Sequence, residues 1–309
     1  MTGFVVSKPV ALIVFNRPEL TRLVLDAVRR VRPSKLLVIA DGPRAHHEGD
    51  GSRCQATQAV IEAVDWPCEV LREYSDVNLG CRRRVSSGID WVFSVVDEAI
   101  ILEDDCLPDP TFFRFCEELL DRYRDEDRVM SIGGTSFHRS PPSSASYCFS
   151  KFPHVWGWAT WRRAWRRYDV NIARWPDVRD ADELRNVIPW PADRRRWTSI
   201  FDRLHRGDID TWDYQWVFAT WLHGGISIVP EVNLVSNLGF SAEATHTTIP
   251  SHLAARPAAA LRFPLRHPLM LQADLSADRF TQRHALRPRW RSRLVKVVQV
   301  ALRQLRGGH

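Results

Sequence analysis

The sequence has no long apolar run. Nowhere in its 309 residues do about 18 or more apolar residues follow one another, the length that a transmembrane helix needs. Residues 1–14 contain a short apolar run without a basic leading segment or a small-residue cleavage site. We interpret this run as a first strand and not as a signal peptide. The cytoplasm is therefore the expected compartment.

Cysteine pairs with metal-binding or redox spacing are also absent. None of the six cysteines belongs to a CxxC pair, and none has histidines nearby at the spacing of a zinc finger. Free thiols in a reducing compartment are the expected state of all six. The sequence shows no internal repeat.

Acidic residues are missing from the C-terminal end. The net charge of the chain is +6, and from Arg283 onward there are eight Arg or Lys residues and no Asp or Glu. Within 289–306, apolar residues recur at helical spacing among basic ones, which predicts a basic amphipathic helix on an anionic membrane surface. Docking of this helix on the rest of the chain is the alternative. Membrane binding would place the protein on the inner face of the cell membrane as a peripheral protein.

The first half of the chain alternates apolar strands with amphipathic helical patterns, which indicates an α/β domain with a mainly parallel sheet flanked by helices. Strands are expected at 10–15, 36–40, 69–73, 99–102 and 129–133. Helices are expected from about 19 onward and at about 56–64, 82–95 and 111–124.

Several polar residues are placed just beyond the ends of these strands. Asn16, Asp41, Asn78 and the acidic triplet 103–105 all have this position. In sheets of this kind, ligands bind in the crevice outside the carboxyl ends of the strands. The shared placement favours a nucleotide site at that edge.

The triplet Glu103-Asp104-Asp105 is the most informative motif. It directly follows the apolar residues 100–102, so that three carboxylates emerge together from a buried strand. Such a run of like charges is costly unless water or a cation balances it, and Mg²⁺ and Mn²⁺ prefer carboxylate and phosphate oxygens. A solvated acidic turn is the alternative. The position after a buried strand favours a site for Mn²⁺ or Mg²⁺ and a diphosphate.

The order of the motifs resembles that of nucleotide-sugar glycosyltransferases with the Rossmann-like GT-A fold, most closely those of the N-acetylglucosaminyltransferase I type. The shared features are an arginine-containing loop, an acidic triplet followed by proline and a Phe-Phe helix, a Gly-Trp element and a Trp-Asp element. Here they are Asn16-Arg17-Pro18, Glu103-Asp104-Asp105, Phe112-Phe113, Gly157-Trp158 and Trp212-Asp213. They span about residues 8–250, with divergent sequence between them. The resemblance implies that Asp105 binds the metal, while Glu103 and Asp104 serve the ribose and the surroundings of the metal.

Three further residues are candidates for binding the donor. The Arg17 guanidinium could contact a diphosphate or ribose, although an ordinary surface arginine in a turn is the alternative. Asp41 is similar to the family's acid that accepts a hydrogen bond from a pyrimidine, although it could simply cap its Asp-Gly-Pro turn. Residues 78–84 resemble a segment of family 2 glycosyltransferases and place three arginines at a helix N-terminus, where anions bind. Of the three we choose Arg83.

An inverting transfer needs a base that removes the proton of the acceptor hydroxyl. Asp213 matches the catalytic Trp-Asp position of the family and is our candidate. Asp210 is the alternative, and it could instead cap the helix that contains Trp216. Enzymes with the GT-A fold often supply a late histidine to the metal, which makes His246 the second metal ligand beside Asp105.

Ten of the thirteen tryptophans lie between residues 156 and 221. Gly157 permits close backbone approach or a positive φ, and the Trp158 indole could pack on a sugar ring, so both are expected to line the donor sugar and acceptor. Most of the others are expected to fill a small second core, in particular Trp161, Trp165, Trp216 and Trp221.

These residues together predict a metal-dependent, inverting glycosyltransferase. Its donor would be a nucleoside diphosphate sugar, with a UDP-sugar favoured by resemblance, and its acceptor a glycan, lipid-linked or small molecule. Residues 1–250 would form the GT-A domain, with a nucleotide-sugar half at 1–150 and an acceptor side at 151–250, and 251–309 a C-terminal extension. No nucleic-acid partner is expected.

Two other functions were weighed. A sugar-nucleotide pyrophosphorylase needs a glycine-rich basic loop after the first strand, and residues 16–20 contain no glycine. A non-catalytic carbohydrate-binding protein would need the tryptophans but neither the acidic triplet nor Asp213.

Overall fold

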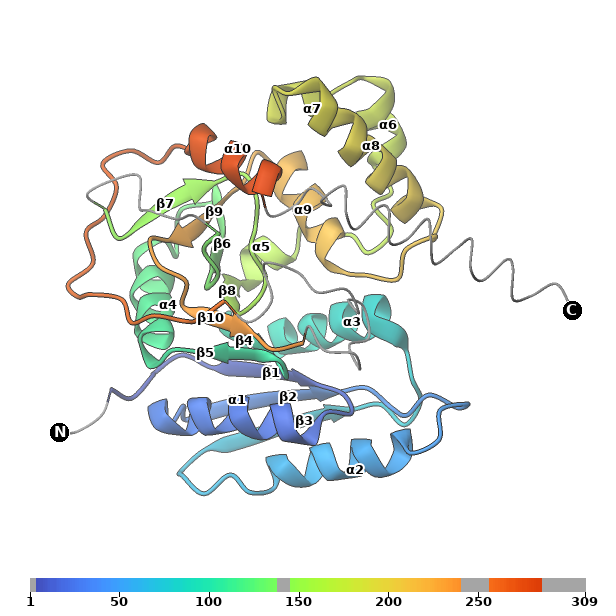
Figure 1. The fold of residues 1–309 in the computed structure, drawn as a ribbon, viewed down its shortest axis with the longest axis vertical. Coiled ribbons are helices and arrows are strands. Elements are labelled where there is room, and N and C mark those ends of the chain that lie inside the picture. The colour runs from blue at the N-terminus through green and yellow to red at the C-terminus, as the bar shows by residue number, and fades with distance from the viewer. Residues whose placement is uncertain (1–3, 138–144, 240–255, 285–309) are drawn as a thin grey trace, which may run out of the picture.

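The computed structural model describes residues 4–137, 145–239 and 256–284 and has an α/β fold around one large sheet (Figure 1). Its strands are β1 Val10–Val14, β2 Lys35–Ala40, β3 Glu69–Tyr74, β4 Glu98–Glu103, β6 Val129–Gly133, β7 Tyr147–Ser150, β8 Trp158–Trp161 and β9 Ile226–Pro230. A separate two-stranded ribbon pairs β5 Cys106–Pro108 with β10 Val235–Asn237. The expected α/β class is confirmed.

The order of strands in the sheet is β3-β2-β1-β4-β8-β6-β9-β7. The first four are parallel, whereas β8 is antiparallel to both β4 and β6, so the sheet is mixed beyond β4. The chain steps from β1 outward to β3 and then returns to the other side of β1 as β4. In α/β sheets the crevice that binds ligands lies at such a reversal, which here is at the carboxyl ends of β1 and β4.

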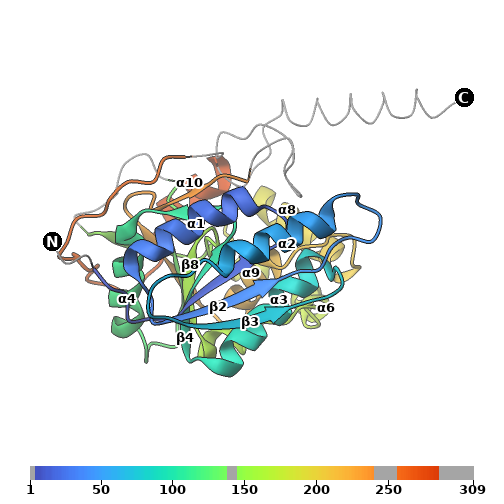
Figure 2. The ribbon, with the colours of Figure 1, turned by 90° about the horizontal axis from the view of Figure 1, so that it is seen from below.

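Helices cover both faces of the sheet. They are α1 Pro18–Val31, α2 Asp50–Ile61, α3 Gly80–Val95, α4 Pro110–Arg122, α5 Arg162–Trp165, α6 Trp175–Asp180, α7 Leu184–Val187, α8 Pro191–His205, α9 Asp213–Leu222 and α10 Leu275–His284. Helices α1, α2 and α4 pack on one face, and α3, α5 and α9 on the other, as the two main hydrophobic clusters show. Figure 2 shows α1 and α2 side by side across the strands from below.

Strands β1 and β6 are buried along their whole length, and β2 is buried from Leu36 onward, since helices cover both sides. All five strands expected in the first half are present within a residue or two. Helix α2 begins at Asp50, earlier than the expected start near 56. The tryptophan-rich segment contains β8, which lies in the middle of the sheet and was not predicted.

The tryptophans mostly fill cores, but they divide among three hydrophobic clusters, whereas the sequence predicted one small second core. Helices α6, α7, α8 and α9 enclose a third cluster, and the ring packing there includes Trp197 against Trp221 at 4.8 Å between centroids. The expected core residues Trp161, Trp165, Trp216 and Trp221 are all buried. The described part of the extension 251–309 packs on the first core through Leu261 and Leu265.

Candidate functional site

The crevice between β1 and β4 is the candidate active site. Strand β4 delivers Glu103 at its end, and Asp104 and Asp105 form the tight turn to β5. Because successive strand residues point to opposite faces, Glu103 shares the α3 and α9 face with Ile101, which belongs to that hydrophobic cluster. Asp104 points the other way, toward the loop after β1. The three carboxylates therefore divide between two sides of the strand end.

Arg17 crosses the crevice to the acidic turn. Its Nη1 donates to Asp105 at 2.7 Å and to Asp104 at 3.2 Å. The Phe15 amide also donates to Asp104 at 3.1 Å. The side chains of Asp104 and Asp105 are only 8% and 13% exposed. The structure thus brings Arg17 together with the triplet. Arg17 is therefore not an ordinary surface arginine in a turn.

The electrostatics of the triplet follow from burial. Burial raises the pKa of Glu103 most, and the charges of Asp105, Asp104 and Asp213 add to that rise. Burial likewise raises the pKa of Asp104, against the opposing charge of Arg17 and the hydrogen bond from Phe15. The three carboxylates lie close to one another and Arg17 offsets their charges only in part, so the pKa values of Glu103 and Asp104 stay raised.

The carboxylates provide hard oxygen donors that fit Mg²⁺ or Mn²⁺. The Asp105 oxygen nearest to Arg17 also lies beside Gly239, and the Asp105 carbonyl accepts from the Leu238 amide at 2.8 Å. Within residues 4–137, 145–239 and 256–284, no group of three or more His, Cys, Asp or Glu side chains is close enough to hold a metal. A metal at Asp105 would therefore take its other ligands from phosphate, water or residues outside these ranges. His246, the predicted second ligand, lies outside them.

Asp213 is the first residue of α9 and faces the same side as Glu103. Its carboxylate accepts from the Tyr214 amide at 2.9 Å and from the Thr211 hydroxyl. It is one of the charges that raise the pKa of Glu103, so the two carboxylates lie within electrostatic range. Asp213, the predicted base, and Asp105, the predicted metal ligand, thus lie at the same edge of the sheet, although 108 residues separate them in the chain.

Asp41 organises a loop from the end of β2. Its carboxylate is buried and accepts hydrogen bonds from the Gly42, Leu79 and Gly80 amides at 3.0, 2.9 and 3.1 Å and from the Asn78 side chain at 3.0 Å. Burial raises its pKa, against these hydrogen bonds. In this arrangement the carboxylate holds the loop that precedes α3. Direct contact between Asp41 and the pyrimidine ring of a nucleotide stays a prediction.

The N-terminus of α3 differs from what the sequence indicated. Its amides at Leu79 and Gly80 bind Asp41, and the Arg82 amide donates to Asp210 at 3.0 Å. Asp210 therefore caps α3 and not α9, whose N-cap position is Trp212. An anion site at the start of α3 is mostly filled by the protein's own carboxylates.

The three arginines of this helix have different surroundings. Arg83, the predicted donor contact, is exposed. Arg82 donates to the Val170 carbonyl at 2.7 Å, while Arg84 is buried and binds the Ala40 carbonyl at 3.1 Å and Glu73. A role for Arg83 in donor binding stays a prediction.

Gly157 and Trp158 lie at the start of β8, next to the end of β4 that carries the triplet. Gly157 has φ +65°, and a Cβ there would lie 2.7 Å from Val235 and 3.3 Å from Leu102, so glycine is required for both reasons. Trp158 is 1% exposed and stacks on Trp212 at 5.6 Å between centroids. Its ring therefore belongs to the core under the crevice, and a contact with sugar stays a prediction.

Sequence reasoning missed Asp50, a buried residue at the start of α2. It accepts from Asn16 at 2.8 Å and from Arg44 at 2.6 Å, and the Arg44 hydrogen bond lowers the pKa of Asp50 to about 2. Asp50 thereby fixes the loop after β1 from which Arg17 reaches the triplet. No local sequence pattern marks an aspartate that acts on a loop 34 residues away.

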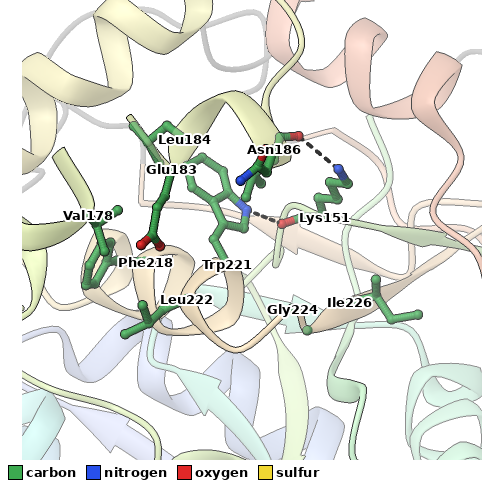
Figure 3. A pocket seen from close by; sticks show the side chains of 12 residues that line it. Lys151, Val178, Glu183, Leu184, Asn186, Phe218, Trp221, Leu222, Gly224 and Ile226 are labelled. Atoms are coloured by element: carbon green, nitrogen blue, oxygen red, sulfur yellow. Dashed lines mark hydrogen bonds between the residues drawn. The ribbon is translucent and has the colours of Figure 1, made fainter. Parts of the chain in front are cut away.

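A cavity of about 440 Å³, which neither the acidic triplet nor Asp213 lines, lies between α6, α7 and the C-terminal half of α9 (Figure 3). Apolar side chains such as Val178, Phe218 and Leu222 line it, together with Glu183 and Lys151. The Lys151 ammonium is engaged by the Val187 carbonyl at 2.9 Å. We place the candidate active site at the carboxylates and not at this cavity, because the charged and polar groups converge there.

The C-terminal segment 289–306, predicted to bind membranes as a basic amphipathic helix, lies outside the described residues. Among the helices that the structure does describe, none is long and apolar enough to cross a bilayer.

Comparisons with known proteins assign the chain to no family. No protein-family model matches the chain, and no curated protein matches its sequence. Among solved structures it is similar to 4-diphosphocytidyl-2C-methyl-D-erythritol synthase from Anaerococcus prevotii, with 9% identity and a TM-score of 0.32. That match covers 50% of this chain and 72% of the other. Similarity at this level carries no argument about function.

Proposed function

We propose that the chain is a metal-dependent, inverting glycosyltransferase of the GT-A type. It would move a sugar from a nucleoside diphosphate sugar to a hydroxyl of a glycan, lipid-linked or small-molecule acceptor. The observation that carries this proposal is the meeting of Arg17, the triplet 103–105 and Asp213 at the crevice between β1 and β4. The resemblance of the motifs in sequence supports it, and it favours a UDP-sugar as donor.

In this proposal the two sides of the strand end have different tasks. On the α1 side, Arg17 would bind the diphosphate, and the carboxylate of Asp105 would hold Mn²⁺ or Mg²⁺. The metal, when bound, neutralises the charge of the departing nucleoside diphosphate. Asp41 holds the loop 76–80 that forms the wall beside the nucleotide.

On the α9 side, Asp213 takes the proton of the acceptor hydroxyl as that oxygen attacks the anomeric carbon. Its position at the start of α9, on the same side of the sheet as Glu103, supports this role. Glu103 lies on this same side, and its carboxyl group stands between Asp213 and the acidic turn in the electrostatics of the site. Attack from the face opposite the diphosphate inverts the anomeric configuration.

Product analysis tests the proposal against its main alternative. Wild-type protein is incubated with a panel of sugar nucleotides and Mn²⁺, with and without pyrophosphate, and the products are separated. A glycosyltransferase releases nucleoside diphosphate, whereas a pyrophosphorylase forms nucleoside triphosphate and sugar phosphate. Loss of nucleoside diphosphate release in both Asp105→Ala and Asp213→Ala is the expected result. Formation of nucleoside triphosphate would instead establish the nucleotidyltransferase function.

A further inference from the structure

Asp210 joins the segment that carries Asp213 to the nucleotide side of the crevice. One oxygen of its carboxylate accepts from the Arg82 amide at 3.0 Å, and the other lies where a Cβ on Gly80 would be 3.0 Å away. Gly80 has φ +78°, a conformation that suits glycine. Asp210 therefore contacts the first turn of α3 from the α9 side, 128 residues away in sequence.

Asp41 holds the same helix start from the opposite side. It accepts from the amides of Leu79 and Gly80, whereas Asp210 binds the amide of Arg82, two residues further along. Two carboxylates from different parts of the chain thus share the orphan amides of one helix. Any shift of the loop 76–80 would be transmitted through Asp210 to the segment that follows it.

The segment from Asp210 to Asp213 is short and well anchored. The Trp212 carbonyl accepts from the Tyr168 hydroxyl at 3.1 Å, and the Trp212 ring is buried against Trp158. The Thr211 carbonyl accepts from the Gln215 side chain at 2.6 Å, and the Thr211 hydroxyl binds Asp213 itself. These contacts restrain Thr211 and Trp212, the two residues between Asp210 and Asp213.

We propose that Asp210 is a positioning residue, which fixes Asp213 relative to the loop 76–80 by capping α3, the helix that follows this loop. This inference rests on the proposed function, in which Asp213 is the base. Asp210 acts through a hydrogen bond from an amide to its oxygen, and its negative charge is not needed for that. Asparagine, which keeps a carbonyl oxygen at the same place, should therefore replace it.

The test compares kcat and the KM for the donor in three variants. In Asp210→Ala, kcat should fall about ten- to hundredfold, because a displaced reactive group costs rate far more than binding, while KM changes by less than about threefold. Asp210→Asn should retain kcat within about threefold. Asp208→Ala is the matched control, because Asp208 pairs with Arg206 at the surface of the same loop. Its kcat should not change.

Two kinetic outcomes would overturn the proposal. Wild-type kcat per folded molecule in Asp210→Ala would show that the cap has no effect on Asp213. A loss in Asp210→Asn as large as in Asp210→Ala would show that the charge itself acts, and would make Asp210 the base.

Hydrogen exchange separates this inference from the proposed function, since it needs no turnover. In Asp210→Ala, amides of peptides covering both 80–83 and 209–215 should exchange faster than in wild type. Faster exchange in 80–83 alone would show a local cap without positioning and would overturn the inference. If wild-type protein turned over no sugar nucleotide, the proposed function would fail while the exchange result still decided whether Asp210 couples the two segments.

Discussion

The Arg17 guanidinium lies 2.7 Å from a carboxylate oxygen of Asp105, although 88 residues separate the two in the chain. This contact joins the loop after β1 to the acidic turn after β4, across the reversal point of the sheet. It places one fixed positive charge among three buried or half-buried carboxylates. The stability of the protein and its affinity for cations should both depend on it.

Replacing Arg17 with alanine should lower the free energy of unfolding by about 3 kcal/mol, because a nearly buried carboxylate pair loses its cation. Urea unfolding measures this change. Arg29→Ala is the matched control, since Arg29 pairs with Asp65 on the surface and its replacement should cost far less stability. Equal midpoints for Arg17→Ala and wild type would refute the role of Arg17 in balancing the triplet.

Replacing Glu103 with glutamine should stabilise the metal-free protein by about 1 kcal/mol while reducing activity, as is common where function requires a strained group. The pKa of Glu103 is raised by burial and by Asp105, Asp104 and Asp213, so its ionisation costs folded-state stability as pH rises above its ordinary range. The gain should therefore be larger at pH 9 than at pH 5.

Glu98→Gln is the control for that experiment, because Glu98 begins the same strand but pairs with Lys8 at 2.8 Å. Glu98→Gln should lower the stability of the protein, because Lys8 loses a charged partner, whereas Glu103→Gln should raise it. A loss in both variants would mean that the triplet is electrostatically balanced without a further cation.

Replacing Gly157 with alanine should cost about 3 kcal/mol, through a strained positive φ and overlap with Val235. Gly207→Ala separates the two effects, because Gly207 has φ +82° but nothing within 4 Å of its Cβ position. It should cost only about 1 kcal/mol. Thermal unfolding of both variants gives the comparison, and equal losses would remove the packing argument for Gly157.

Asp278 should make the protein less stable as pH rises from about 4 to about 6. Burial raises its pKa from 3.8 to about 6, against hydrogen bonds from Ser150 and the Lys151 amide. Between these values the folded state holds a proton that the unfolded state has lost, so raising the pH costs stability. In Asp278→Asn this part of the pH dependence should flatten, as urea midpoints at several pH values would show. An unchanged slope would contradict the raised pKa.

The central strands and their helices could be predicted from sequence because apolar runs and helical periodicity mark them directly. Strand β8 could not, since Trp158–Trp161 is only four residues long and gives no alternation, and its pairing with β4 spans about sixty residues of chain. Helix α10 lies in a Pro- and Ala-rich region where the periodicity is weak.

Parts of the candidate site could also be predicted from the sequence. Arg17 and the triplet follow strands, and parallel strands bring their carboxyl ends to one edge, so their meeting follows from the fold class. Asp210 was misjudged because a cap on a helix 128 residues away leaves no local pattern. Among three consecutive arginines, sequence could not show that Arg84 is buried while Arg83 is exposed, because neighbouring helix positions differ by about 100° in direction.

The most direct test of the proposed function is a crystal structure of the protein with Mn²⁺ and a nucleoside diphosphate, with data collected at the manganese absorption edge. The anomalous peak should lie beside the Asp105 carboxylate, with the diphosphate between the ends of β1 and β4 and within reach of Arg17. Asp105→Ala crystals grown in the same way should lack the peak. A nucleotide bound elsewhere, or a manganese peak away from Asp105, would contradict the proposed glycosyltransferase site.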